Sequence, residues 1–298
     1  MSLPAPPAPP ANALPLQRAA RAKINLFLRV VGRRADGYHL LQSLVGFTDL
    51  SDRLSVAAAD TLTLQISGPF AAQCAAADDN LVLRAGRLLA NEAGRTLGAA
   101  LTLVKNIPVA AGLGGGSADA AATLLLLRDH WGLALAPARL HDLALRLGAD
   151  VPVCLGRRAT LVGGVGEVLA PAPALPQAGV VLANPRRALP TEAVFKQMQP
   201  PYQDILAPPR GFADSAELAK EIGRYGNGLT VAARALCPPI GAVLSALAAL
   251  PDALVAQMSG SGATCFALFK DAAAARLGGA ALARQHADWF VQAGALME

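Results

Sequence analysis

A run of glycine residues near the middle of the chain constrains the fold more than any other feature. Four of the five residues at 112–116 are glycine. The run follows an apolar segment at 101–104 that is typical of a strand and precedes a segment at 117–131 that is typical of a helix. A backbone without Cβ atoms can approach an anion closely, and the first turn of a helix offers unsatisfied N–H groups. The segment therefore predicts a phosphate-binding loop; the alternative is a flexible turn that binds no ligand.

Other glycine-containing motifs do not fit the spacing of this segment. A Walker A loop needs a lysine after its last glycine, and none follows Gly116. A dinucleotide-binding fingerprint needs glycine or alanine where Ser117 stands. The nucleophile elbow of the α/β-hydrolases fails because Asp119 takes the place of its final glycine. Phosphate binding is therefore favoured over hydride transfer and acyl transfer.

The composition excludes several classes of protein. The mean hydropathy of +0.39 over 298 residues raises the question of a membrane span. The longest uncharged apolar stretch, 235–251, is interrupted by Pro238 and Pro239, so we expect no membrane association. The four cysteines lack metal-ligand spacing, which indicates thiols in a reducing cytoplasm. A net charge of +5 without a basic tract favours small anionic ligands over nucleic acid.

The order of the expected elements indicates an α+β protein with two domains. Residues 1–20 carry six prolines and no acid, so we expect a disordered tail. A proline-rich stretch at 171–176 separates an N-terminal domain at 21–172 from a C-terminal domain at 179–298. The expected strands are 22–31, 53–56, 61–67, 101–104, 179–183, 254–258, 264–269 and 289–292, and the expected helices are 80–92, 117–131, 137–147, 215–224, 229–236, 240–250 and 272–286.

Residues 108–120 resemble the phosphate-binding signature of the GHMP kinases, a family of small-metabolite kinases. Three further blocks, Ala-Lys-Ile-Asn-Leu at 22–26, Arg-Ala-Asp-Gly-Tyr-His at 34–39 and Leu-Gly-Ala-Asp-Val-Pro at 147–152, resemble the branch whose acceptor is a cytidine-diphosphate polyol. The resemblance implies a two-domain GHMP kinase fold, with an N-terminal mixed α/β domain like that of a ribosomal protein and a ferredoxin-like C-terminal domain. It also implies ATP-dependent phosphorylation of a hydroxyl, with ATP and Mg²⁺ as cofactors.

The resemblance implies that Lys23 and Asp150 are the catalytic pair. Phosphoryl transfer requires a base near the attacking hydroxyl and a cation near the developing charge. Asp150 follows a helix end and precedes Val151 and Pro152, so we expect apolar neighbours to desolvate its carboxylate and Lys23 to keep it ionised. Without the resemblance, a turn aspartate and a solvated lysine at a strand edge would account for the same residues.

The resemblance also implies a site for the cytidine-diphosphate polyol. It places the cytosine between Tyr38 and Phe195, with hydrogen bonds from His39. Stacking on aromatic rings tolerates any base, so His39 must supply the choice of cytosine. Asn25 and Thr191 are the implied polar contacts. Val45 and Gly228 depart from the family pattern, which has an aromatic residue and an acid at these positions.

On the nucleotide side the resemblance implies an adenine contact, a basic residue before the loop and the loop itself. Ser117 is a candidate ligand of Mg²⁺ or of the β-phosphate, and Asp119 either has a role in this site or complements the helix dipole. The segment 259–263 resembles the last family motif, a glycine turn that approaches the active cleft. The implied ATP contacts are Asn80, Lys105, Pro108, Gly112, Leu113, Gly114, Gly115, Gly116 and Ser117.

Three alternatives remain open at this point. The first is another GHMP kinase, for homoserine or a mevalonate derivative, which would share the loop but not the block at 34–39. The second is a non-catalytic nucleotide- or RNA-binding protein of the same fold, which would have no need of both Lys23 and Asp150. The third is a nicotinamide oxidoreductase. The expected partners are ATP and a small-molecule acceptor in the cytoplasm, without nucleic acid or membrane, and the protein is a monomer or a homodimer.

Overall fold

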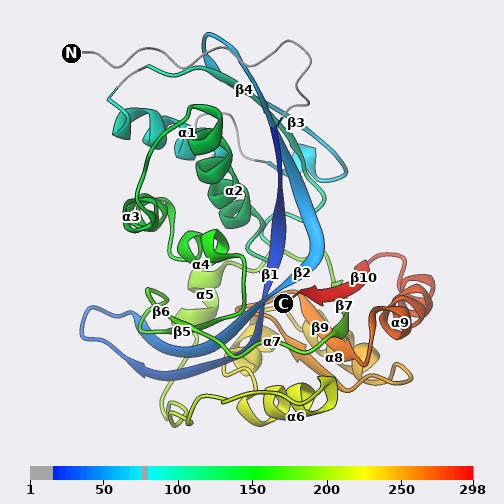
Figure 1. Ribbon diagram of the computed structural model, residues 1–298. Helices are drawn as coiled ribbons and strands as arrows, with labels where there is room; N and C mark the ends of the chain where they lie inside the picture. Colours follow the sequence, from blue (N-terminus) through cyan, green and yellow to red (C-terminus); the bar gives the residue numbers. More distant parts are fainter. Residues whose placement is uncertain (1–15, 75–79, 95, 298) are drawn as a thin grey trace. The chain divides into compact units, whose positions relative to one another are not determined.

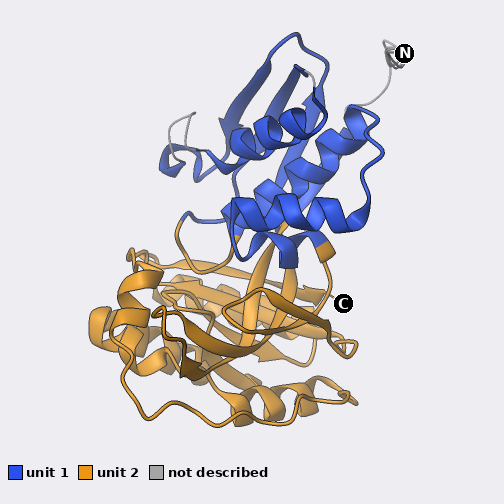
Figure 2. Cartoon of the chain, turned by 90° about the vertical axis from the view of Figure 1, so that its left-hand side faces the viewer, with its two compact units in different colours: residues 1–20, 51–109, 115–155 blue, residues 21–50, 110–114, 156–298 orange. Residues whose placement is uncertain are grey.

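The computed structural model describes residues 16–74, 80–94 and 96–297 (Figure 1). These residues form two compact units (Figure 2). The first takes its described residues from 16–20, 51–109 and 115–155, and the second takes them from 21–50, 110–114 and 156–297. The units interleave along the chain because the strands β1 (Leu16–Arg33) and β2 (His39–Ala57) contribute residues to both.

The first unit contains a small mixed sheet and a group of helices. The second half of β2 pairs antiparallel with β4 (Ala99–Val104), and β3 (Leu62–Ser67) pairs parallel with β4. Buried and half-buried residues alternate along β4, as expected for a strand with one face on the core. The helices are α1 (Leu81–Glu92), α2 (Gly115–His130), α3 (Pro137–Leu147) and the short α4 (Val151–Gly156), and a 3₁₀ turn spans Ala71–Gln73.

Helix α2 is the centre of the first unit. It is buried along most of its length, and α1 and α3 both pack against it. Small residues make this packing close: a Cβ atom on Gly86 of α1 would lie 2.8 Å from a methyl of Leu62 and 3.1 Å from a methyl of Leu127. The first turn of α2, which follows the glycine-rich segment, is therefore held by a packed helix.

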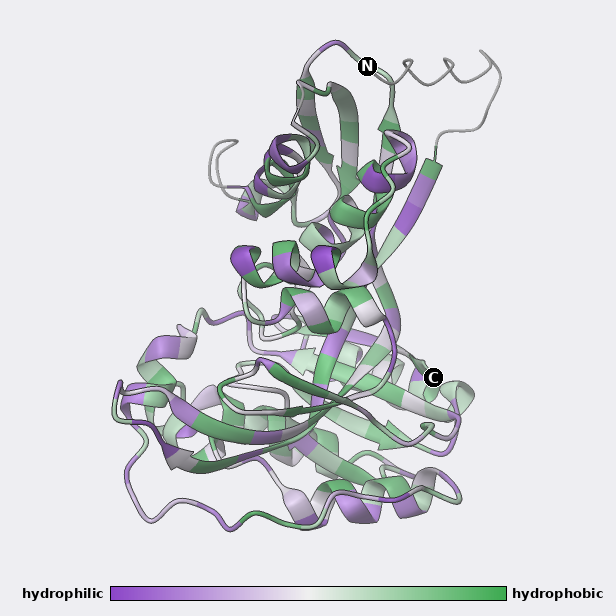
Figure 3. Cartoon of the chain, turned by 60° about the vertical axis from the view of Figure 1, so that its left-hand side comes forward, coloured by the Kyte–Doolittle hydropathy of each residue, from purple (hydrophilic) through white to green (hydrophobic). Residues whose placement is uncertain are grey.

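The second unit contains an antiparallel sheet in the order β2, β10, β7, β9, β8. Strands β7 and β9 are buried at every position, so they read as continuous apolar runs rather than alternating ones (Figure 3). Helix α9 packs against β7 and β10, and α8 packs against β8 and β9. The bounds are β5 (Thr160–Gly163), β6 (Val168–Pro171), β7 (Ala178–Asn184), α5 (Thr191–Lys196), α6 (Ser215–Tyr225), α7 (Thr230–Leu236), α8 (Pro239–Ala248), β8 (Val255–Met258), β9 (Cys265–Phe269), α9 (Ala272–Gln285) and β10 (Phe290–Met297).

The structure corrects several expected boundaries. Strand β1 begins at Leu16, so residues 16–20 are part of a strand and not of the expected tail; residues 1–15 lie outside the described chain. Strand β2 extends over 39–57 although the sequence predicted only 53–56, because polar residues interrupt its apolar pattern. The short elements α4, α5, β5 and β6 were not predicted. The division into domains at 21–172 and 179–298 stays a prediction.

Among the residues that the structure describes, no helix is both long enough and apolar enough to cross a bilayer.

Candidate active site

The glycine-rich segment adopts a backbone that only glycine accepts easily. Gly112 and Gly114 have φ angles of 76° and 62°. A Cβ atom on Gly112 would lie 2.6 Å from the carbonyl oxygen of Gly262, and one on Gly114 would lie 2.5 Å from Cγ of Lys23. Helix α2 begins at Gly115, two residues before the expected start at Ser117, so its first turn contains the last two glycines.

The turn at 259–264 holds residues 111–112 in place within the second unit. The Thr264 hydroxyl donates to the carbonyl of Ala111, and the Ser259 hydroxyl donates to the carbonyl of Gly112 over 3.4 Å. The backbone N–H of Lys23 donates to the carbonyl of Leu113 over 2.9 Å. Leu113 is buried, whereas Gly116 is exposed and Ser117 and Pro108 are half-buried. The carbonyls of the segment are thus occupied by protein donors, and Gly116 and Ser117 are accessible to a ligand.

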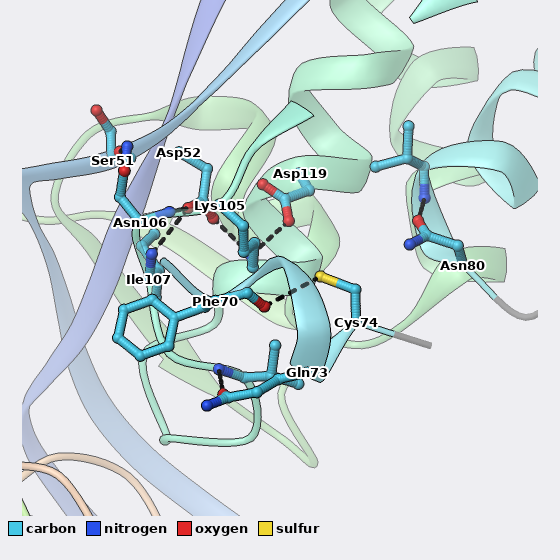
Figure 4. Close-up of polar contacts among 12 residues, drawn as sticks. Ser51, Asp52, Phe70, Gln73, Cys74, Asn80, Lys105, Asn106, Ile107 and Asp119 are labelled. Atoms are coloured by element: carbon cyan, nitrogen blue, oxygen red, sulfur yellow. Dashed lines mark hydrogen bonds and ion pairs between the residues drawn. The ribbon is translucent and has the colours of Figure 1, made fainter. Parts of the chain in front are cut away.

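Lys105 lies in a buried ionic cluster in the first unit (Figure 4). Its Nζ is 2.5 Å from Oδ2 of Asp52 and 2.6 Å from Oδ2 of Asp119. We call Asp52, Lys105 and Asp119 the lysine–carboxylate cluster. The sequence did not predict a role for Asp52; its only signal was an acid directly before the strand expected at 53–56.

Burial and charge compete within the lysine–carboxylate cluster. Burial raises the pKa of Asp119, Lys105 lowers it and Asp52 raises it again, and the result is a pKa of about 7. For Lys105, burial disfavours the ammonium, but Asp119 and Asp52 outweigh that effect and raise the pKa of the side chain. Oδ1 of Asp119 has no hydrogen-bond partner among the described residues.

Asn80, the expected adenine contact, caps helix α1. Its side-chain oxygen accepts a hydrogen bond from the N–H of Val82 over 2.9 Å, which satisfies one of the open donors of the first turn. The capping bond fixes the amide of Asn80, a residue that is 8% exposed, within the first unit (Figure 4).

A chain of hydrogen bonds orients Lys23 in the second unit. The side chain is 7% exposed, and its Nζ donates to Oδ1 of Asn25 over 2.9 Å. Nδ2 of Asn25 donates to the hydroxyl of Ser43 over 2.8 Å, and its backbone N–H donates to the hydroxyl of Ser259 over 3.1 Å. The expected substrate contact Asn25 therefore orients the expected catalytic lysine. Ser43 was not predicted, because hydrogen bonds to a hydroxyl leave no pattern in the sequence, whereas Ser259 begins the segment 259–263 that resembles the last family motif.

Asp150 precedes helix α4 in the first unit. Its carbonyl accepts the first helical hydrogen bond from the N–H of Cys154, at 3.3 Å, and Pro152 stands in the first turn, where proline is tolerated. Asp150 is exposed, although Val151 and Pro152 are buried. The expected desolvation of its carboxylate is therefore wrong, because the apolar neighbours point into the core and the aspartate does not.

Two aromatic rings lie beside His39, that of the predicted Phe195 and that of Tyr202, which was not predicted. The ring of His39 lies 5.3 Å from the ring of Phe195 and 5.9 Å, edge-on, from the ring of Tyr202. Tyr38 is 64% exposed. Tyr202 was missed; its only signal was an aromatic residue directly after two prolines in a stretch without expected elements. Thr191 is exposed at the start of α5, where its hydroxyl shares a hydrogen bond with that of Ser261 at 2.9 Å.

His39 is buried among these groups. It is 8% exposed, and its Nε2 has no hydrogen-bond partner among the residues described. Burial lowers the pKa of the imidazole below 6.5, and the charge of Arg33 lowers it further. At pH 7 the ring is neutral, so it offers one donor and one acceptor.

Comparisons with known proteins agree with this geometry. Two family models match, the N-terminal domain of the GHMP kinases at 80–157 and the C-terminal domain of the GHMP kinases at 210–288. A protein of Rhodospirillum rubrum named 4-diphosphocytidyl-2-C-methyl-D-erythritol kinase is 50% identical over 279 residues, which are 94% of this chain and 92% of that protein. A protein of the same name from Paramagnetospirillum magneticum is 49% identical over 275 residues, 91% of this chain and 95% of its own length.

The chain belongs to the GHMP kinase family.

Solved structures confirm the expected fold of this GHMP kinase. A crystal structure of 4-(cytidine 5'-diphospho)-2C-methyl-D-erythritol kinase matches with a TM-score of 0.78 and 35% identity, over 95% of this chain and 100% of the other. Homoserine kinase from Cytophaga hutchinsonii matches with a TM-score of 0.69 over 97% of this chain and 96% of the other, and its 18% identity shows a common fold alone. The kinase is therefore an ATP-dependent enzyme, and the interpretations as a pure binding protein and as an oxidoreductase are wrong.

The residues of this GHMP kinase fit ATP better than they fit a protein-bound metal. The start of α2 presents N–H groups and a positive dipole end at the accessible Gly116 and Ser117. No group of three or more histidine, cysteine, aspartate or glutamate side chains suited to a metal ion occurs in the described ranges. Magnesium usually binds through one or two protein ligands together with substrate phosphates, and Ser117 stays a candidate ligand from the sequence.

Proposed function

We propose that this kinase transfers the γ-phosphoryl group of ATP to the 2-hydroxyl of 4-diphosphocytidyl-2-C-methyl-D-erythritol, a step of non-mevalonate isoprenoid precursor biosynthesis. One observation carries the proposal. The buried Lys23, oriented by Asn25, lies directly against Gly114 of the glycine-rich segment in a chain that is half identical to enzymes of this name. The nearness of Lys23 to Gly114 supports a cation beside the transferred group.

The glycine-rich segment is the proposed site of the ATP phosphates. Its contacts would come from the N–H groups at the start of α2, from the hydroxyl of Ser117 and from the glycines at 112–116, with Pro108 and Leu113 shaping the segment. Asn80 is the proposed adenine contact. Magnesium would neutralise charge on the phosphates; the protein supplies the hydrogen-bond donors and the dipole.

Asp150 and Lys23 are the proposed catalytic residues. Asp150 accepts the proton of the 2-hydroxyl while the hydroxyl oxygen forms a bond to the γ-phosphorus. The bond between that phosphorus and the β,γ-bridging oxygen breaks, and ADP leaves. Lys23 stabilises the negative charge on the transferred group. The exposure of Asp150 supports this role, because a base must be open to its substrate.

The cytosine is proposed to bind beside His39. A neutral imidazole with a buried, unsatisfied Nε2 suits a base that offers both a donor and an acceptor. Phe195 would pack on one face of the base, and the exposed Tyr38 would close over the other. Thr191 would contact the polyol or diphosphate through its hydroxyl.

An ATP-consumption assay with three acceptors tests the proposal. The cytidine-diphosphate polyol should be phosphorylated, as seen by a new phosphate resonance in ³¹P NMR, whereas homoserine and mevalonate should not. Phosphorylation of mevalonate or homoserine in preference to the cytidine compound would overturn the assignment of substrate and leave the kinase family intact.

A further inference from the structure

The lysine–carboxylate cluster links the two ends of the glycine-rich segment. Lys105 directly follows β4 and precedes the segment, whereas Asp119 lies in the second turn of α2, just after it. The ammonium of Lys105 is 2.6 Å from Oδ2 of Asp119 (Figure 4). The chain thus leaves Lys105, passes through the segment and returns to a residue bound to the same lysine.

Asp52 extends this link to the backbone before the segment. Its Oδ2 lies 2.5 Å from Nζ of Lys105, and its Oδ1 accepts from the N–H groups of Asn106 over 2.5 Å and Ile107 over 2.8 Å. The side-chain amide of Asn106 donates to the carbonyl of Ser51 over 3.0 Å. These bonds fix the direction in which the chain leaves β4.

Close packing leaves the lysine little room to move. A Cβ atom on Gly115, the first residue of α2, would lie 3.1 Å from Nζ of Lys105 and 3.0 Å from Cγ2 of Ile107. On the other side, a Cβ atom on Gly68 would lie 2.7 Å from the carbonyl oxygen of Lys105. The ammonium therefore lies directly beneath the junction of the segment with its helix.

The charged groups of the lysine–carboxylate cluster pair with one another within the first unit. Asp52 is 0% exposed, and Lys105 and Asp119 are each 3% exposed, so one ammonium serves two buried carboxylates. The ammonium has three N–H donors, and two of them go to Asp52 and Asp119. The third belongs to a side chain that is 3% exposed, so a phosphate would have to open the packing around Lys105 to reach it.

We propose that Asp52, Lys105 and Asp119 are positioning residues that clamp both ends of the glycine-rich segment, so that Lys105 acts on ATP through the shape of the segment and not by touching phosphate. The inference rests on the proposed use of the segment as the phosphate site. It replaces the direct contact between Lys105 and ATP that the family resemblance implied.

The variant Asp119→Asn separates the two roles of Lys105. If the cluster is a clamp, the variant loosens the start of α2 before any nucleotide binds. Backbone amides at 106–107 and 115–121 should then exchange with deuterium about tenfold faster in the nucleotide-free enzyme, and the KM for ATP should rise about tenfold. The KM for the cytidine substrate should stay within about twofold of the parent.

The exposed Asp129 provides a matched control. It also lies on α2 and also pairs with two cations, Arg18 and Arg128, but it is exposed to solvent. Asp129→Asn should change neither exchange at 106–121 nor the KM for ATP. Unchanged exchange in Asp119→Asn, together with an equal or lower KM for ATP, would show that removal of the carboxylate frees Lys105 for phosphate, and it would overturn the clamp. Faster exchange with an unchanged KM for ATP would likewise overturn it.

A second variant covers the case in which Asp119→Asn fails to fold. Lys105→Met combined with Asp52→Asn and Asp119→Leu replaces all three buried charges by neutral side chains of similar size, an exchange that buried ion pairs often tolerate. The amide oxygen that Asp52→Asn provides can still accept from the N–H groups of Asn106 and Ile107, so exchange should rise at 115–121 alone and ADP binding, measured by calorimetry, should weaken. Unchanged ADP binding in this triple variant would refute the clamp. If Gly115→Val also left the KM for ATP unchanged, the phosphate site itself would be refuted.

Discussion

The lysine–carboxylate cluster of the first unit and the proposed base site of the second unit are built in different ways. Around the glycine-rich segment the first unit uses buried charges, and the carboxylate of Asp52 alone accepts from one ammonium and two backbone amides. Around His39 the second unit uses aromatic rings, and Tyr38 next to it is 64% exposed. The first site is held in shape before its ligand binds, whereas the second has a face that its ligand must complete. The difference suits the ligands, because phosphates require fixed donors and a flat base requires a surface that can close on it.

Asp150→Asn should give the largest effect. It separates the carboxylate of Asp150, the proposed base, from the buried carboxylates of the lysine–carboxylate cluster. Asparagine keeps the shape but cannot accept the hydroxyl proton, so kcat should fall by a factor of about 10² to 10⁴ with little change in KM. Single-turnover measurements with saturating substrates would give the rate. Because Asp150 is exposed and Asp119 is buried, the melting temperature should fall less in Asp150→Asn than in Asp119→Asn. A kcat within a few-fold of the parent would show that Asp150 is not the base.

Gly115→Val tests the rigidity of the nucleotide site. The new side chain would begin 3.0 Å from Ile107 and 3.1 Å from the ammonium of Lys105, and both of these residues are buried. Overpacking of this kind costs about 1 to 3 kcal/mol, so the KM for ATP should rise by a factor of about ten to a hundred. Gly156→Ala, at the end of α4 in open space, is the matched control and should bind ATP normally. Normal ATP kinetics in Gly115→Val would contradict a preformed phosphate site.

Tyr38→Ala and Tyr202→Ala compare the two tyrosines beside His39. If Tyr38 closes on the base, its loss should weaken the binding free energy of the cytidine substrate by about 1 to 3 kcal/mol, and ATP should bind as before. Tyr202 packs edge-on against His39, so its loss should weaken the binding free energy of the cytidine substrate by about 0.5 to 1.5 kcal/mol. Steady-state kinetics with each substrate varied in turn would measure both. Equal weakening of ATP binding would mean that these rings stabilise the fold and not the ligand.

The pH dependence of stability should show the smallest effect. The lowered pKa of His39 means that the folded state disfavours the protonated ring. Its contribution is complete above pH 6.5, decreases as the pH falls below that value and levels off below the folded pKa. The free energy of unfolding, measured by urea titration between pH 8 and pH 5, should therefore fall less in His39→Gln than in the parent. His130, whose pKa burial also lowers, remains in both proteins and cancels in the comparison. If the free energy of unfolding fell equally with pH in the two proteins, His39 would be hydrated in solution.

The sequence by itself determined the fold class, the family and the main candidate residues. The prediction of a phosphate-binding loop at 112–116 needs no tertiary information, because it rests on a strand, a glycine run and a helix in succession. The helix at 137–147 was likewise predicted from the proline at its start and from Gly148 after its end. Such features depend on residues that are close in the chain, where propensity and spacing carry the information.

Only the tertiary structure decided what surrounds those residues. Asp52 meets Lys105 across 53 positions of sequence, Asn25 meets Ser259 across 234, and Tyr202 meets His39 from a loop without regular structure. The same cause explains the correction at the site: apolar neighbours in sequence did not bury Asp150. Burial and charge pairing are set by residues that folding brings together, and a single sequence does not record those partners.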